Sequence, residues 1–370
     1  MTANADRRAR LADHALSLIR REIRAMPGYT PGEQQPGAIK LNTNECAYPP
    51  SPRVMETLGR IADNSLRLYP DPVSRHLREA AAARYDVSPD QVLAGNGSDD
   101  CLTILYRAFL APGDRVICPW PTYGLYDTLA TLQGAAITTT AFAVSEDERR
   151  WLLPAALAVD PAKLILIANP NNPSATLIPV DELRRLADQT TGIVVVDEAY
   201  VDFADSPASI LPFLDQHPNV IVLRTFSKSF SLAGARLGLL FAAPALIAQL
   251  MKVKDSYNVN VLTQALGAVA LEDRAYHDEV VRKTLAERAR LESALGGLGL
   301  RWPESQANFL LCDVGDEAEA VYRALKREGI LVRWWDSPEL STRLRITVGK
   351  PEENDRLIAA LSSLLGAAVS

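Results

Sequence analysis

Residues 163–200 read KLILIANPNNPSATLIPVDELRRLADQTTGIVVVDEAY, and this stretch decides the fold class. It contains the apolar runs 164–168 and 193–196, and neither run alternates with polar residues. Strands of this kind are buried on both faces of a sheet. The segment 179–190 between them has the mixed polar and apolar spacing of a helix. A strand, a helix and a second strand in this order predict a parallel sheet with helices on both faces.

The same alternation continues on both sides of this stretch. Further strands are predicted at 92–95, 114–119, 135–140, 219–227 and 235–244, and further helices at 98–113 and 121–134. The fold class is therefore α/β, with a large, mostly parallel, seven-stranded α/β/α sheet domain. Beyond residue 244 the pattern changes to longer helices at 244–254 and 261–296, and a small α+β unit follows.

The chain has 370 residues, which is longer than one usual domain, so two domains are predicted. We expect an N-terminal arm that belongs partly to the small domain at 1–44. A large domain is expected at 45–258, and a small C-terminal domain with a linking helix at 259–370. The Pro- and Gly-rich span at 27–52 looks like an ordered but irregular entry to the large domain.

Composition and charge exclude several classes of protein. The net charge of −6 argues against a nucleic-acid-binding surface. There is no apolar run of about 18 residues that could span a membrane. The first 26 residues carry charge throughout and lack the apolar core of a secretory signal, so we expect a cytoplasmic protein. The four cysteines and four histidines do not cluster, so no metal site is predicted.

Polar residues follow the predicted strands, at the edge where open α/β sheets bind ligands. Asp197 follows one apolar run, and an unpaired buried carboxylate is costly, so a cationic partner is expected. Asn172 follows another run, and Lys228 lies between two serines after a third. Glycines at 95 and 97 with Ser98 at a helix start could bind a phosphate. Each feature also has a plain structural interpretation: an ion pair, a turn, a surface lysine or a helix cap.

Taken together, these residues match the chemistry of pyridoxal 5′-phosphate. This cofactor needs an amine for its aldehyde, an acid that keeps its pyridine nitrogen protonated, and donors for its phosphate. Lys228, Asp197 and the glycine loop supply these three groups. An arginine such as Arg236 or Arg345 would suit a phosphate or a carboxylate, because its planar fork donates two parallel hydrogen bonds.

The order of these motifs resembles the fold-type I aminotransferases, and within them the histidinol-phosphate aminotransferase family. The resemblance extends from about residue 28 to the final helix. It rests on LNTNE at 41–45, LYPDP at 68–72, GNGSD at 95–99, PTYGLY at 121–126, NPNNP at 169–173, DEAYVDF at 197–203, RTFSKSFSLAGARLG at 224–238 and LRITVGKPEEN at 344–354. It implies a fold-type I PLP-dependent transferase in which 45–258 is the PLP-binding domain.

The resemblance also implies a role for each site residue. Lys228 would hold the cofactor's aldehyde covalently and then shuttle the substrate proton, and Asp197 would pair with the pyridine nitrogen. Tyr200 and Asn172 would hold the phenolic oxygen, and Tyr123 would stack on the ring. The cofactor phosphate would be bound by Ser98, Asp99, Ser227, Arg236 and Tyr69, the last reaching over from the partner in a homodimer with shared active sites.

Substrate identity is implied less sharply. Arg345 would bind the substrate carboxylate, while Arg333 and Tyr29 would meet a substrate phosphate. The resemblance implies a ping-pong transamination of L-histidinol phosphate with 2-oxoglutarate in histidine biosynthesis. An aromatic amino acid aminotransferase is one alternative, because Trp334 and Trp335 follow Arg333 and the segment KDSYNVN at 254–260 departs from the family pattern. A threonine-phosphate decarboxylase is the second alternative.

Overall fold

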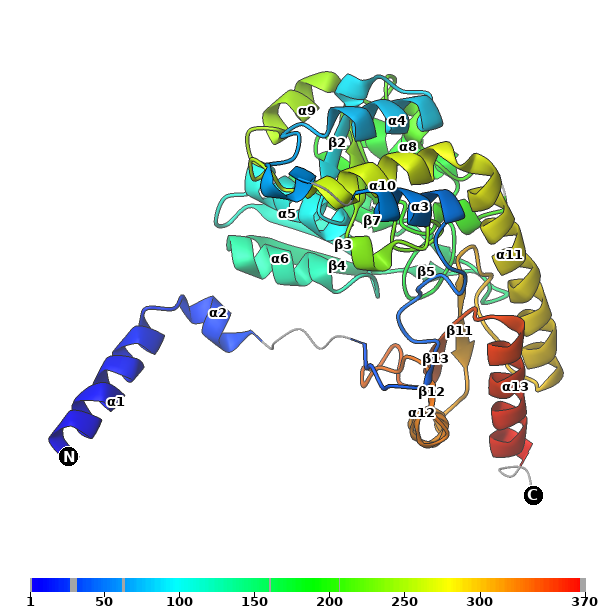
Figure 1. Cartoon of the computed structure of the whole chain (residues 1–370). Coiled ribbons are helices and arrows are strands. Elements are labelled where there is room, and N and C mark those ends of the chain that lie inside the picture. The colour runs from blue at the N-terminus through cyan, green and yellow to red at the C-terminus, as the bar shows by residue number, and fades with distance from the viewer. Residues whose placement is uncertain (1, 27–31, 62–63, 160, 206, 367–370) are drawn as a thin grey trace.

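The computed structural model describes residues 2–26, 32–61, 64–159, 161–205 and 207–366 (Figure 1). All seven strands predicted for the large sheet form, and they pair in the order β2-β10-β9-β8-β7-β3-β4. β10 is antiparallel to both of its neighbours, and the other pairs are parallel. The prediction of a mostly parallel seven-stranded sheet is therefore confirmed. The strands are β2 Val92–Gly95, β3 Arg115–Trp120, β4 Ala136–Ala141, β7 Leu164–Ala168, β8 Ile193–Asp197, β9 Val220–Thr225 and β10 Gly238–Phe241.

The central strands β7, β8 and β9 are buried on both faces, as their unbroken apolar runs predict. Alternate side chains enter two different apolar clusters. Ile165 and Val194 lie in one cluster, and Leu164 and Val195 lie in the other. Each such side chain contributes about 1.5–3 kcal/mol to the free energy of unfolding. Because these strands are parallel, their carboxyl ends meet at one edge, with Ala168 paired to Asp197.

Helices cover the sheet and continue beyond it (Figure 1). The predicted helices at 98–113, 121–134, 179–190 and 244–254 form as α5, α6, α8 and α9. The large part of the chain contains α3 Pro52–Arg60, α4 Arg75–Tyr85, α5 Ser98–Phe109, α6 Leu125–Gln133, α7 Ala156–Val159, α8 Val180–Gln189, α9 Pro244–Leu250, α10 Val261–Glu272 and α11 Arg274–Gly297. Short 3₁₀ turns are η1 Asn64–Arg67, η2 Pro89–Gln91, η3 Val201–Phe203, η4 Leu211–Phe213 and η5 Ala233–Ala235.

The prediction of one continuous helix over 261–296 is wrong. The structure divides this segment into α10 and α11 at Asp273, whose backbone leaves the helical region with φ −84° and ψ 65°. The Asp273 side chain accepts a hydrogen bond from the Ser51 hydroxyl. An aspartate side chain can form hydrogen bonds with nearby backbone groups that compete with those of the helix, so aspartate is a residue type that favours a helix end at this position.

The C-terminal unit has its own apolar cluster, which includes Leu41, Leu291 and Ile346. Leu291 lies on α11, so this helix connects the sheet domain with the smaller unit (Figure 1). β11 pairs antiparallel with β13, and β1 pairs parallel with β12. The domain boundaries at residues 44 and 258 stay predictions. The elements of this unit are β1 Ile39–Lys40, β11 Phe309–Asp313, α12 Ala318–Arg327, β12 Ile330–Leu331, β13 Arg343–Thr347 and α13 Pro351–Gly366.

The N-terminal residues form α1 Thr2–Ser17 and α2 Arg21–Ala25, and α1 extends away from the sheet domain in Figure 1. Arg20 donates a hydrogen bond from Nη2 to the Leu132 carbonyl at 2.5 Å, so the start of α2 lies near the end of α6. A short hairpin joins β5 Ala143–Val144 to β6 Trp151–Leu152. In the described parts of the chain, no helix has the length and hydropathy needed to span a membrane.

Candidate active site

Asp197 is the last residue of β8, and its side chain is buried at the carboxyl edge of the sheet. The Tyr126 hydroxyl donates a hydrogen bond to Asp197 Oδ2 at 3.1 Å, and the Ala199 N–H donates to Oδ1 at 3.2 Å. Burial raises the pKa of Asp197 to about 6; the hydrogen bond from Tyr126 opposes this rise, and the charge of Asp99 adds to it. A buried carboxylate of this kind is stabilised when a cationic nitrogen pairs with it.

Sequence reasoning gave no role to Tyr126, although it belongs to the quoted PTYGLY motif. Tyr126 lies on α6 three residues after Tyr123, and the two rings meet edge to face with centroids 5.7 Å apart. Its ring is almost fully buried. Tyr123 lies two residues before α6 begins, so the two rings meet across the start of the helix.

The glycine loop between β2 and α5 contacts the arginine that was predicted to bind phosphate. Gly97 has a φ of +92°, and a Cβ on it would lie 2.7 Å from Arg236 Nη2. A Cβ on Gly238 would lie 2.3 Å from the Ser98 nitrogen. Glycine at both positions therefore lets the backbone and Arg236 approach closely. Ser98 and Asp99 are the first two residues of α5, and N–H groups at a helix start can donate to an anion.

Four predicted phosphate ligands gather around this loop. Arg236 donates from Nη1 to Ser227 Oγ at 3.3 Å and from Nη2 to Asp99 Oδ2 at 3.0 Å. Ser98 begins α5 beside them. The Tyr123 hydroxyl donates to Asp99 Oδ1 at 3.1 Å. Side chains from β2–α5, the loop after β9 and the start of α6 therefore meet in one place.

Lys228 follows β9 and is half-buried. Its ammonium group donates a hydrogen bond to the Thr43 carbonyl at 2.9 Å, and Nζ lies 5.5 Å from the centre of the Tyr200 ring. The Tyr200 hydroxyl accepts a hydrogen bond from Asn44 Nδ2 at 3.1 Å. The segment after β1 thus contacts both Lys228 and Tyr200. No role was predicted for Thr43 or Asn44, although both lie in the quoted LNTNE motif.

Arg345 on β13 reaches the predicted Asn172. It donates from Nη1 to Asn172 Oδ1 and from Nη2 to the Asn42 carbonyl, both at 2.6 Å. The backbones of Arg345 and Arg333 pair through two hydrogen bonds, at 2.8 and 3.0 Å. The two predicted substrate arginines are therefore directly opposite each other.

Aromatic rings connect these arginines with the lysine. The Tyr200 and Phe309 ring centroids are 5.0 Å apart. The Arg345 guanidinium lies 5.3 Å from the Phe309 ring and 5.3 Å from the Trp335 ring. The structure therefore brings Lys228, Tyr200 and Arg345, which come from distant segments of the chain, into one region, and their roles stay predictions.

Two predicted residues are not placed with this group. Tyr69 is 80% exposed and stacks on Tyr257 with ring centroids 4.4 Å apart. Its predicted contact with a partner's cofactor stays a prediction. Tyr29 lies outside the residues that the structure describes.

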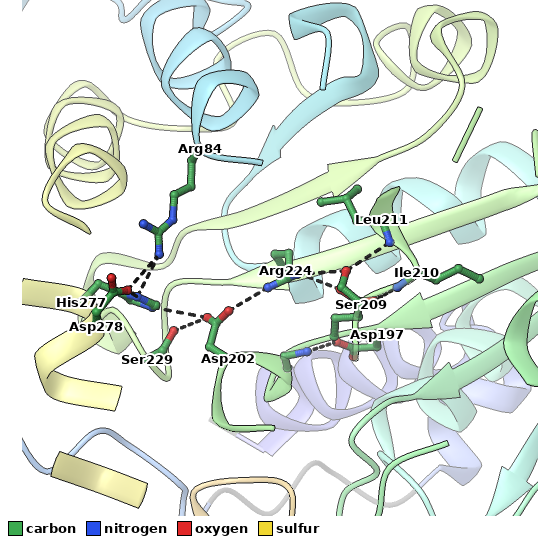
Figure 2. Close-up of polar contacts among 12 residues, drawn as sticks. Arg84, Asp197, Asp202, Ser209, Ile210, Leu211, Arg224, Ser229, His277 and Asp278 are labelled. Atoms are coloured by element: carbon green, nitrogen blue, oxygen red, sulfur yellow. Dashed lines mark hydrogen bonds and ion pairs between the residues drawn. The ribbon is translucent and has the colours of Figure 1, made fainter. Parts of the chain in front are cut away.

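A buried ionic network next to the site was also missed (Figure 2). Arg224 pairs with Glu198 Oε2 and with Asp202 Oδ1, each at 2.9 Å. The Ser229 hydroxyl donates to Asp202 Oδ2 at 2.5 Å, and His277 Nε2 lies 3.6 Å from the same oxygen. Glu198 and Ser229 are the direct neighbours of Asp197 and Lys228 in the chain. The network therefore fixes the two loops that carry these residues.

Opposing effects act on the acids of this network. Burial alone would raise the pKa of Asp202, but the nearby His277 ring and the charge of Arg224 outweigh it and hold this pKa below its ordinary value. Burial also raises the pKa of Glu198, against the charge of Arg224. Asp202 is therefore ionised in the folded protein at neutral pH, and Arg224 has a charged partner.

The site has the groups that pyridoxal phosphate requires. The close approach of Arg236 to Gly97 forms a phosphate cradle that a Cβ would fill. Asp197 lies at the other end of the site, where its buried carboxylate can pair with a cationic ring nitrogen. Lys228 lies on the neighbouring strand end, with an amine that can react with an aldehyde. The donor set therefore fits this cofactor and defines the class of a PLP-dependent enzyme.

Comparison with known proteins agrees with this class. Residues 36–361 match the family model of aminotransferase class I and II. The chain therefore belongs to the class I and II aminotransferase family. Within that family it is similar in sequence to proteins named histidinol-phosphate aminotransferase.

The chain is 43% identical to histidinol-phosphate aminotransferase 1 of Trichormus variabilis, over 94% of this chain and 99% of that protein. It is 41% identical to the histidinol-phosphate aminotransferase of Citrifermentans bemidjiense, over 94% and 98%. Among solved structures, histidinol-phosphate aminotransferase from Sinorhizobium meliloti in complex with pyridoxal-5′-phosphate superposes with a TM-score of 0.85. That structure is 27% identical, and the match covers 95% of this chain and 98% of that one.

Proposed function

We propose that this aminotransferase transfers the amino group of L-histidinol phosphate to 2-oxoglutarate, giving imidazole acetol phosphate and L-glutamate, in histidine biosynthesis. Identities above 40% to histidinol-phosphate aminotransferases over nearly the whole chain support this substrate. The single structural observation that carries the proposal is the pairing of Arg333 with Arg345. Two guanidinium groups at one end of the site suit an anionic substrate such as a phosphorylated amine.

Pyridoxal phosphate, when bound, supplies an aldehyde that reacts with amines and a protonated pyridine ring that withdraws electrons from the bond to be broken. We assign Asp197 to keep that ring nitrogen protonated by Coulomb attraction in a buried place. Tyr200 and Asn172 hold the phenolic oxygen. Lys228 binds the aldehyde and, as a free amine, takes the proton of the substrate Cα on Nζ and returns it. The Tyr200 ring lies 5.5 Å from Nζ and covers one side of this amine.

Several residues position the phosphate groups. The cofactor phosphate is assigned to Ser227, Arg236 and the first N–H groups of α5 at Ser98 and Asp99, and Tyr123 is assigned to stack on the ring. The substrate end is assigned to Arg345 and Arg333, with Tyr29 as a further phosphate ligand. Arg345 would bind the carboxylate of 2-oxoglutarate in the second half of a ping-pong cycle.

We also propose that the protein works as a cytoplasmic homodimer in which Tyr69 of each subunit reaches the cofactor phosphate of the other. The high exposure of Tyr69 and Tyr257, at 80% and 44%, supports a role at an interface. Mixing Tyr69→Phe and Lys228→Ala subunits tests this arrangement. A shared site predicts that mixed dimers regain activity, because one of their two sites then has both native residues.

The aromatic amino acid alternative is favoured by one observation, the rings of Phe309 and Trp335 beside Arg345. Steady-state turnover with 2-oxoglutarate decides between the substrates, and CO₂ release from threonine phosphate tests the decarboxylase alternative. We expect kcat/KM for histidinol phosphate to exceed that for phenylalanine. The reverse order would refute the proposed substrate.

The role of Lys228 has its own test. Lys228→Ala removes the amine, and we expect transamination to be lost while the cofactor still binds noncovalently. Borohydride reduction followed by peptide mapping should label Lys228 in the wild-type protein and leave the variant unlabelled. Retained turnover in the variant would contradict the assignment.

A further inference from the structure

Arg333 and Arg345 occupy directly opposite positions in an antiparallel backbone pair. Their backbones form a hydrogen-bonded antiparallel pair, with Arg333 N–H donating to the Arg345 carbonyl at 3.0 Å and the reverse bond at 2.8 Å. Residues paired in this way have Cα atoms about 5.5 Å apart, and their side chains leave the ladder on the same side. Like charges directly opposite each other destabilise a strand pair. Other contacts must therefore hold these side chains in place.

One aromatic ring contacts both guanidinium groups. The Arg333 Cζ lies 5.4 Å from the centre of the Trp335 ring, and the Arg345 Cζ lies 5.3 Å from the same centre. A cation near an aromatic ring is attracted by the quadrupole of the ring. Arg345 also has neutral partners in Asn172 and the Asn42 carbonyl. The Trp335 ring therefore offers each arginine a favourable contact that does not neutralise its charge.

Trp335 is itself anchored, and its neighbour Trp334 is used differently. Trp335 is half-buried and packs against the apolar cluster that includes Ile165 and Val194 of the large sheet. Trp334 packs in the cluster of the C-terminal unit, and its indole N–H donates to the Ser341 carbonyl at 2.8 Å. Trp334 therefore packs within its own unit, whereas Trp335 packs against a cluster whose members come from both the large sheet and the C-terminal unit.

We infer that Trp335 is a positioning residue that holds Arg333 and Arg345 as one anion-binding pair and so selects amines that carry a phosphate. This inference rests on the proposed function, because it assumes that both arginines bind substrate. With Trp335 in place, two forked donors are preorganised for a phosphate before it binds. Without the Trp335 ring, the two guanidinium groups repel each other and Arg333 turns toward solvent. Binding of a phosphate must then first bring the two arginine side chains together, which weakens the affinity.

The effect belongs to binding rather than to the chemistry at Lys228. In the chain of contacts, Trp335 is separated from Lys228 by Arg345, Phe309 and Tyr200. Loss of Trp335 is therefore expected to raise the KM for a phosphorylated amine and to leave kcat nearly unchanged. A purely structural role would lower the unfolding midpoint and reduce turnover of every substrate alike.

The test combines kinetics with a binding measurement on the enzyme loaded with cofactor. The variants are Trp335→Leu, Trp335→Phe, which keeps a smaller ring, and the matched control Trp334→Phe. The probe is inorganic phosphate, titrated by calorimetry, with Arg333→Met identifying the part of the signal that belongs to this site. Unfolding midpoints of all variants are measured in parallel.

We expect Trp335→Leu to raise the Kd for phosphate and the KM for histidinol phosphate about 3- to 30-fold, the range from an exposed to a desolvated cation–π contact. Trp335→Phe should raise the Kd and the KM about twofold or more. If the Leu variant does not fold, the Phe variant alone provides the test. Trp334→Phe should change neither value. Equal phosphate affinity in wild type and Trp335 variants, or no phosphate binding that depends on Arg333, would overturn the inference. If wild type fails to turn over histidinol phosphate, the proposed function falls while the phosphate titration still decides the role of Trp335.

Discussion

Replacing Tyr126 by Phe should change the protonation of Asp197 without changing the shape of the site. The variant removes one hydroxyl, which donates to Asp197 Oδ2 at 3.1 Å, and keeps the ring. The Ala199 N–H remains as a donor to the other carboxylate oxygen. Because Tyr126 stabilises the ionised form, its loss must raise the pKa of Asp197 above the value of about 6 that it has in the cofactor-free protein.

The magnitude follows from the strength of the bond. A hydrogen bond to a charged group contributes about 1.5–3 kcal/mol, which corresponds to a rise of roughly one to two pKa units. In the wild type the pKa of Asp197 lies above its ordinary value of 3.8, so between these pH values the folded protein binds more protons than the unfolded chain. The free energy of unfolding therefore falls by about 3 kcal/mol as the pH rises from about 4 to about 6. In Tyr126→Phe this fall should continue to about pH 7–8.

Urea unfolding of the cofactor-free protein from about pH 4 to about pH 8.5 measures this directly. The quantity of interest is the difference between the wild-type and Tyr126→Phe curves, since other titrating groups cancel in it. The control is the same pair of proteins with Asp197→Asn added, because the carboxyl group that titrates is then gone. In that background Tyr126→Phe should add no pH dependence. Parallel curves in the native background, or an extra fall that persists after Asp197→Asn, would refute the assigned bond.

Two further predictions concern the loop and the network. Gly97→Ala should lower the free energy of unfolding by about 1–3 kcal/mol, because Gly97 has a φ of +92° and the new Cβ would lie 2.7 Å from Arg236 Nη2. It should also raise the Kd for pyridoxal phosphate in equilibrium dialysis, and an unchanged Kd would argue against Arg236 as a phosphate ligand. Asp202→Asn leaves Arg224 with one acid and should cost about 2–4 kcal/mol at about pH 7 in urea unfolding. Because the folded-state pKa of Asp202 is lowered, its ionised form stabilises the folded protein above about pH 4, and this stabilisation is lost as the pH falls. The free energy of unfolding of the variant should therefore fall less than that of wild type in acid. Curves of the two proteins that stay parallel would contradict this.

Much of the fold could be predicted because its signals are local. The doubly apolar runs at 164–168 and 193–196 identify buried strands, and both occur as β7 and β8. The prediction of one helix over 261–296 was wrong because composition alone does not reveal the turn at Asp273. That turn coincides with a hydrogen bond from Ser51, a residue 222 positions away.

Some residues of the candidate site could also be selected from local sequence signals, and others could not. Lys228, Asp197, Asn172, Arg236 and Arg345 could be selected because each follows a strand signal or lies in a recognisable motif. Tyr126 and Asn44 could not, since a tyrosine or asparagine in a motif does not show which oxygen it contacts. Their partners are 71 and 156 positions away in the chain.

The sequence by itself determined the α/β class, the strand ends that carry polar groups, and the type of chemistry those groups can perform. Strand periodicity and residue type are properties of short segments, and parallel strands must bring their carboxyl ends to one edge. Only the tertiary structure decided that Tyr126 orients Asp197, that Thr43 meets Lys228, and that Trp335 rather than Trp334 contacts the two arginines. The first two contacts join segments that are remote in sequence, and the third depends on which way each tryptophan side chain packs, so none of them can be read from a short segment alone.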